Sequence, residues 1–119
     1  MKHLLLVFLG GGLGSALRYG IGKWTVGSWA PFPLGTFTVN VVGSLLIGLI
    51  MGLALRNSTI SQNTVLLLVT GFCGGFTTYS AFAYENYSLL KNGDLLTFSL
   101  YTLGSLVLGF AAVFLGIWL

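Results

Sequence analysis

Three polar side chains repeat at intervals of four residues along one apolar stretch of the chain. Thr36, Asn40 and Ser44 stand at positions i, i+4 and i+8, so in a helix they share one face. The Asn40 amide offers two donors and one acceptor. A polar stripe of this kind favours either a hydrated ion pathway or hydrogen bonding between helices. Tyr101 and Ser105 form a similar, shorter track nearer the C-terminus.

A second candidate site lies in residues 71–82, where two adjacent glycines precede two threonines. Gly74 and Gly75 weaken a helix, and a break there would leave backbone carbonyls without their helical partners. Freed carbonyls bind hard cations, whereas hydroxyls and amides serve an ion of either sign. Tyr79 and Phe82 are three residues apart, and their ring edges carry partial positive charge. This spacing favours contact with an anion or, alternatively, ordinary aromatic packing.

Two charged residues stand close to these segments. Arg18 either snorkels to the lipid headgroups or sets a positive potential at a vestibule, and Glu85 either snorkels or pairs near a helix end. The sequence contains no cluster of metal-ligating side chains, no nucleophile with an adjacent base and no paired carboxylates. We therefore expect that the protein is not an enzyme.

Composition places these residues in a membrane. Of 119 residues, five are Lys or Arg and two are Asp or Glu, so 6% are charged, whereas 55% are hydrophobic and the mean hydropathy is +0.96. So few charges cannot cover the surface of a soluble domain, and the hydrophobicity excludes intrinsic disorder. Five dispersed cations form no basic stripe for nucleic acid. An integral membrane protein is the class that remains.

The charges divide the chain into four long uncharged stretches. A transmembrane helix needs about 20 mostly apolar residues. Pro31 and Pro33 are poorly tolerated inside a helix, whereas Asp94 suits a helix N-terminus. We expect a single membrane domain, residues 1–119, with spans at approximately 3–29, 35–56, 63–90 and 94–119. The first segment also resembles a cleavable signal peptide, although no soluble mature domain follows it.

The cations are divided almost evenly between the two ends of the predicted bundle. Lys2 and Arg56 fall on one side, and Lys23, Lys91 and Arg18 on the other. The positive-inside rule needs an excess on one side, so we expect insertion in both orientations, unless an insertase or a partner decides. Four helices fill their own centre, so transport needs an oligomer. Dual insertion favours an antiparallel dimer.

Small residues at four-residue spacing predict close helix packing. The spacing occurs in Gly10 and Gly14, in Ser44, Gly48 and Gly52, in Ser105 and Gly109, and in Ala112 and Gly116. General tolerance of glycine in membrane helices is the alternative for any one pair.

Three stretches of the chain resemble the small dual-topology fluoride channels, the Fluc or CrcB-type family. They are residues 11–19 (GGLGSALRY), 35–44 (GTFTVNVVGS) and 71–82 (GFCGGFTTYSAF), of which the third is the most specific. The resemblance implies an all-α integral membrane protein with four transmembrane helices per chain, the third broken at mid-membrane. It also implies an antiparallel homodimer with two pores in the lipid bilayer of the bacterial inner membrane. That dimer would export fluoride passively from the cytoplasm, with a structural sodium ion at its axis and no nucleic-acid partner.

The resemblance assigns roles to single residues. The family's pore asparagine falls on Asn40, its two pore phenylalanines on Tyr79 and Phe82, and its last-helix polar track on Tyr101 and Ser105. The sodium ion, held by backbone carbonyls, falls on Gly74 and Thr77. The remaining matches are the vestibule arginine Arg18, the third-span glutamate Glu85 and the pore-lining neighbours Thr36 and Ser80.

The chain departs from the family pattern at two positions. Tyr79 stands where Phe is usual, which adds a hydroxyl that either donates to fluoride or narrows the pore, and Ala81 stands where Thr is common. Two other functions stay open on the residues alone. A small multidrug exporter shares the four spans and dual topology, but it needs a buried carboxylate and the first span has none. A non-transporting assembly subunit is the other.

Overall fold

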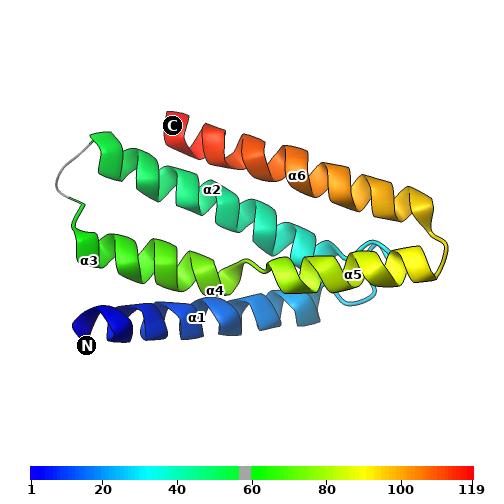
Figure 1. Ribbon diagram of the computed structural model, residues 1–119, viewed down its shortest axis with the longest axis horizontal. Coiled ribbons are helices and arrows are strands. Elements are labelled where there is room, and N and C mark those ends of the chain that lie inside the picture. The colour runs from blue at the N-terminus through cyan, green and yellow to red at the C-terminus, as the bar shows by residue number, and fades with distance from the viewer. Residues whose placement is uncertain (57–59) are drawn as a thin grey trace.

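The computed structural model describes residues 1–56 and 60–119, and every regular element within these ranges is a helix (Figure 1). The first two spans are α1 (Lys2–Trp24) and α2 (Leu34–Arg56), and the last is α6 (Leu95–Trp118). The third span consists of α3 (Gln62–Val65), the π-helix η1 (Leu66–Cys73), α4 (Gly74–Phe76) and α5 (Tyr79–Lys91). All four spans are long and apolar enough to cross a membrane. The predicted all-α fold with four spans and a broken third helix is confirmed.

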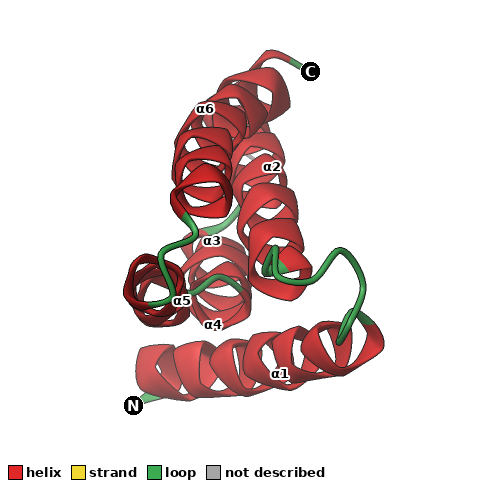
Figure 2. Ribbon diagram, turned by 90° about the vertical axis from the view of Figure 1, so that its right-hand side faces the viewer, coloured by secondary structure: helices red, strands yellow, loops and turns green. Residues whose placement is uncertain are grey.

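The helices form an elongated body of 49 × 30 × 20 Å, in which α1 is inclined to the other spans (Figure 2). α2 packs mainly on α6, and α1 packs mainly on η1 and α4. Figure 2 shows the consequence: the third span lies between α1 on one side and the α2–α6 pair on the other. Both termini lie at the same end of the bundle (Figure 1), as four spans require.

The first helix ends earlier than predicted, at Trp24 instead of near residue 29. Thr25 Oγ1 donates to the Ile21 carbonyl at 2.9 Å, which satisfies an acceptor of the last turn. Gly27 then adopts a left-handed φ of +81°, which glycine tolerates because it has no Cβ. The chain therefore leaves the helix before the two prolines.

The start of the last helix is as predicted. Asp94 is the residue before α6, and its Oδ1 accepts a hydrogen bond from the Thr97 amide at 3.0 Å. This bond satisfies one of the amides that a helix N-terminus leaves unpaired. A negative side chain is also favourable at that end of the helix dipole.

Glycines bring the helix backbones into contact at both main interfaces. A Cβ on Gly14 would overlap the Phe72 carbonyl, and a Cβ on Gly48 would lie 3.1 Å from the Gly116 Cα. The small-residue spacings in α1, α2 and α6 are therefore packing faces. Large apolar side chains point away from these faces and are exposed, as lipid contact requires, including Leu4, Phe8, Phe110 and Phe114.

The α2–α6 interface provides a stability test. A Cβ on Gly116 would lie 2.6 Å from both the Leu45 carbonyl oxygen and the Leu49 amide nitrogen. Because these atoms are backbone, Gly116→Ala should lower the free energy of unfolding by about 1–3 kcal/mol. The measurement is SDS-titrated unfolding of the purified protein.

The matched control is Gly104→Ala in the same helix. A Cβ at Gly104 meets only the Phe37 ring, at 3.6 Å, which is an ordinary contact. This variant should unfold at the wild-type SDS concentration or higher. Equal destabilisation by both variants would show that backbone contact at Gly116 is not what holds α2 on α6.

Candidate functional site

The third span is interrupted at residues 77–78, where the backbone is extended. Thr77 has ψ 158° and Thr78 has φ −150° and ψ 120°. The Thr77 amide still bonds the Cys73 carbonyl, at 3.0 Å, but the Thr78 amide donates to Asn40 Oδ1 instead, at 2.8 Å. The Gly74 carbonyl therefore loses the amide that a continuous helix would give it.

A second amide is diverted one turn later. The Ala81 amide donates to Thr78 Oγ1 at 3.2 Å, and in a continuous helix it would serve the Thr77 carbonyl. Thr78 is thus the N-cap of α5. Gly74 and Thr77 are therefore the residues whose carbonyls lose their helical amides to other acceptors. They are also the two residues on which the family resemblance places a sodium ion. Carbonyl oxygens freed in this way are hard ligands.

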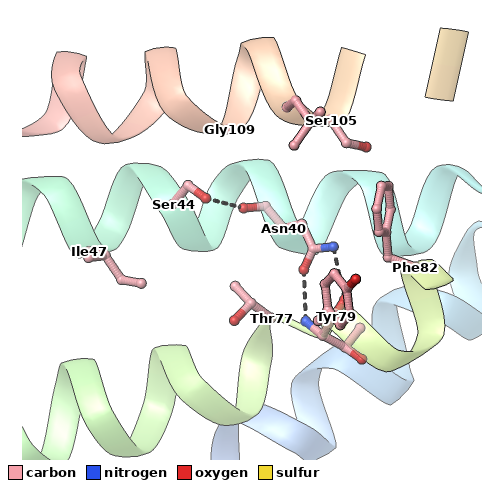
Figure 3. Close-up of a pocket in the computed structure, with 10 residues that line it drawn as sticks. Asn40, Ser44, Ile47, Thr77, Tyr79, Phe82, Ser105 and Gly109 are labelled. Carbon is pink, nitrogen blue, oxygen red and sulfur yellow. Dashed lines mark hydrogen bonds between the residues drawn. The ribbon is translucent and has the colours of Figure 1, made fainter. Parts of the chain in front are cut away.

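Asn40 ties α2 to the break through both ends of its amide. Its Oδ1 accepts from the Thr78 amide at 2.8 Å, and its Nδ2 donates to the Thr78 carbonyl at 3.1 Å. The Ser44 hydroxyl donates within α2 to the Asn40 carbonyl at 2.7 Å. Figure 3 shows Asn40 reaching from α2 toward the break, with both dashed bonds. One Nδ2 proton is left over, since the amide nitrogen carries two.

Arg18 ties α1 to the opposite side of the break. Its Nε donates to the Gly75 carbonyl at 3.0 Å, and the Ser15 hydroxyl lies 3.4 Å from the same oxygen. Gly75 and Gly11 meet closely enough that a Cβ on Gly75 would lie 3.0 Å from the Gly11 Cα. Of the two interpretations that the sequence allowed for Arg18, simple snorkelling does not describe a side chain whose Nε bonds the backbone of the third span.

A cavity of about 290 Å³ lies beside the break, between α2, α5 and α6. Its polar lining includes Asn40 and Ser44 from α2, Thr77 and Thr78 from the break, and Ser105 from α6. Tyr79 and Phe82 supply two aromatic rings, whose centroids lie 6.2 Å apart (Figure 3). The Ser105 hydroxyl oxygen is buried and has no hydrogen-bond partner among the described residues. Buried hydroxyls are nearly always paired, so this one is available to an occupant of the cavity.

A separate polar cluster forms around Glu85. The Thr36 hydroxyl donates to Oε2 and the Tyr101 hydroxyl to Oε1, both at 2.7 Å. Glu85 is therefore held by hydroxyls from α2 and α6, neither by a cation near a helix end nor by snorkelling. Phe82 connects this cluster to the cavity, since its ring centroid lies 5.1 Å from that of Tyr101.

The structure places the predicted site residues in two groups, which their spacing along the sequence did not distinguish. Asn40, Tyr79, Phe82 and Ser105 line the cavity with Thr77, whereas Thr36, Tyr101 and Glu85 form the carboxylate cluster. Tyr101 is fully buried, so it does not continue the Ser105 track into the cavity. Ser80 is exposed, with its Oγ 3.4 Å from Thr78 Oγ1. The functional roles of all these residues stay predictions.

Sequence reasoning missed Thr78, which joins three parts of this arrangement. It holds both bonds to Asn40, caps α5 and lines the cavity. The only signal was the threonine pair after the glycines. Two identical neighbours give no means of telling which one turns toward α2.

Comparison with known proteins identifies the family. The sequence model described as CrcB-like protein, Camphor Resistance (CrcB), matches residues 5–117. The chain belongs to the CrcB family. The resemblance inferred from the three sequence stretches is thereby confirmed.

Curated relatives of this CrcB-family chain are similar over nearly its whole length. A protein of Gloeothece citriformis is 55% identical and covers 100% of this chain and 97% of its own length. One of Chlorobium chlorochromatii is 52% identical over 97% of this chain and 89% of its own length. One of Azobacteroides pseudotrichonymphae is 43% identical over 98% and 94%. All three are named fluoride-specific ion channel FluC. With four spanning helices, the CrcB-family chain is a multi-pass membrane protein.

The two hydrogen bonds between the Asn40 amide and the Thr78 backbone, called here the fork, can be tested by mutation. Asn40→Ala removes the partners of both the Thr78 amide and the Thr78 carbonyl, and each backbone group left unpaired away from water is costly. We expect the free energy of unfolding to fall by about 1–3 kcal/mol, measured by SDS titration.

Ser44→Ala is the matched control on the same helix face. The Ser44 hydroxyl bonds only a carbonyl of its own helix, so its removal should change stability by less than about 0.5 kcal/mol. If Ser44→Ala destabilised the protein as much as Asn40→Ala, the fork would not be the contact that secures the break.

Proposed function

We propose that this CrcB-family chain forms a channel through which fluoride leaves the cytoplasm passively, lowering its concentration and toxicity. The proposal takes the substrate from the names of relatives that are 43–55% identical over nearly the full chain. It takes the path from the cavity beside the broken third span. The membrane that suits this function is the bacterial inner membrane, across which the anion moves down its electrochemical gradient.

The observation that carries the proposal is the donor set of the cavity. The unpartnered Ser105 hydroxyl and the second Nδ2 proton of Asn40 are both available to an anion. The rings of Tyr79 and Phe82 add edges of partial positive charge. These groups replace water around fluoride without a formal charge. Neutral donors of this kind bind an anion less tightly than a cation does, so the ion can also leave the site.

A second copy of the chain completes the site. The cavity is open on one side, and the Tyr79 ring beside it is 81% exposed. In an antiparallel homodimer each chain would cover the opening of the other, giving two pores related by a two-fold axis in the membrane plane. The near-even division of the five cations between the two ends supports insertion in both orientations.

Sodium fits the break at the axis of such a dimer. The Gly74 and Thr77 carbonyls have lost their helical amides to Asn40 and to the Thr78 hydroxyl, and both would hold the ion. A sodium ion bound there would supply the electrostatic partner that carbonyl oxygens without amides lack in lipid. The protein itself positions them, through Asn40 from α2 and Arg18 from α1.

The direct test is fluoride efflux from proteoliposomes, followed with a fluoride electrode and compared with chloride efflux. The wild-type protein should release fluoride and retain chloride. Ser105→Ala should slow fluoride release by about 10- to 150-fold, since a hydrogen bond to a charged group contributes about 1.5–3 kcal/mol. Because the Ser105 hydroxyl bonds no described protein group, folding should be unaffected.

The control for this assay is Leu103→Ala, which shortens a side chain that is 62% exposed toward lipid. It should conduct like the wild type. Absence of fluoride efflux from the wild-type protein would reject the channel. Wild-type flux from a folded Ser105→Ala protein would reject the role of this hydroxyl while leaving the channel in place.

Dual insertion predicts a second measurable outcome. A C-terminal alkaline phosphatase fusion and a C-terminal green fluorescent protein fusion, which are active on opposite sides of the membrane, should both give signal. Lys2→Gln and Arg56→Gln together remove the cations of one end of the bundle, and this double variant should favour one of the two reporters. A wild-type protein active with only one fusion would contradict dual insertion.

A further inference from the structure

A second cavity, of about 210 Å³, lies at the carboxyl end of α1, and two basic side chains belong to its lining. Arg18 and Lys23 line it from α1, Thr36 from α2 and Thr78 from the break. Two of the chain's five cations therefore face one space. Lys23 contributes to the division of charge between the two ends of the bundle and lies outside the lining of the cavity that contains Asn40.

The charged residues in the lining of this cavity are both basic. Its described lining contains no acidic residue. The Glu85 carboxylate, which accepts the hydroxyls of Thr36 and Tyr101, lines a neighbouring cavity that shares Thr36 with this one. Lys23 Nζ lies 5.9 Å from the centroid of the Tyr19 ring, which keeps the ammonium on the side of α1 that carries the cavity. Tyr19 lines the cavity as well.

Arg18 has donors to spare. Among the described residues its Nε–H alone is used, by the Gly75 carbonyl, which leaves the four N–H groups on its two terminal nitrogens to bind an acceptor with several oxygens. A planar guanidinium matches the paired oxygens of a phosphate group better than a single-atom anion.

The depth of the cavity in the bilayer points to the same chemistry. Trp24, Trp29 and Tyr19 are exposed around this end of the bundle, at 86%, 72% and 67%. Exposed Trp and Tyr gather at the level of the lipid headgroups. Lys23 lies in the last turn of α1, between two of these aromatic residues in the sequence. The cavity therefore opens near the depth at which phosphate groups are concentrated.

We propose that Arg18 and Lys23 bind a phosphate group in this cavity, supplied either by the headgroup of an anionic phospholipid or by free phosphate. Thr78 lines both this cavity and the one that contains Asn40. The bound phosphate therefore lies next to the cavity of the proposed fluoride path.

The test measures phosphate binding to the full-length protein and does not depend on fluoride transport. Three nanodisc samples are compared: phosphatidylcholine alone, phosphatidylcholine with inorganic phosphate, and phosphatidylcholine with phosphatidylglycerol. The readouts are the thermal unfolding midpoint and, by native mass spectrometry, the phosphatidylglycerol retained by the protein. Phosphatidylglycerol or inorganic phosphate should raise the midpoint, and whichever of the two does so identifies the source.

Lys23→Gln should weaken the effective ligand about fivefold, since one basic residue near the membrane surface contributes about 1 kcal/mol. Lys91→Gln removes a charge from the same end of the bundle but from outside the cavity lining, so it should bind like the wild type. Equal weakening by both variants would show non-specific attraction and overturn the site. Failure of both ligands to shift the wild-type midpoint would overturn it as well.

Discussion

A helix that breaks inside a bilayer must find partners for its backbone groups, because lipid offers none. In this protein the partners come from two different helices. Asn40 of α2 takes the amide and the carbonyl of Thr78, and Arg18 of α1 takes the carbonyl of Gly75. Both contacts depend on close packing of the backbones, which the glycines permit. The break is thus also the point at which α1 and α2 are joined to the third span.

The same bonds create the candidate ion site. Because the Thr78 amide bonds Asn40, it no longer bonds the Gly74 carbonyl. Because the Ala81 amide bonds the Thr78 hydroxyl, it no longer bonds the Thr77 carbonyl. Beside these carbonyls lie neutral donors and ring edges, while the basic side chains of Arg18 and Lys23 line a separate cavity. In a low dielectric a full charge at the narrowest point would hold an anion too tightly for rapid passage. Placing the cations to one side avoids this.

Much of the fold could be predicted because lipid imposes simple rules. Uncharged stretches of sufficient length had to be helices, Asp94 had to precede one, and the glycine pair had to weaken another. The end of α1 was less predictable, since apolar residues continue beyond Trp24 and only the left-handed Gly27 and the hydrogen bond of Thr25 end the helix there. Of the site, Asn40, Tyr79, Phe82 and Ser105 were foreseen as polar or aromatic faces. The clustering of Thr36 and Tyr101 on Glu85 was not.

By itself, the sequence determined that the chain spans a membrane four times, that the third span breaks and which side chains are polar at that depth. These are local properties, set by composition and by spacing along one helix. Tertiary structure decided which of those groups bond one another and which are left for an ion. Asn40 and Thr78 are 38 residues apart, and Arg18 and Gly75 are 57 apart. Such pairs depend on the register between packed helices, which backbone contact at glycines sets and no single segment encodes.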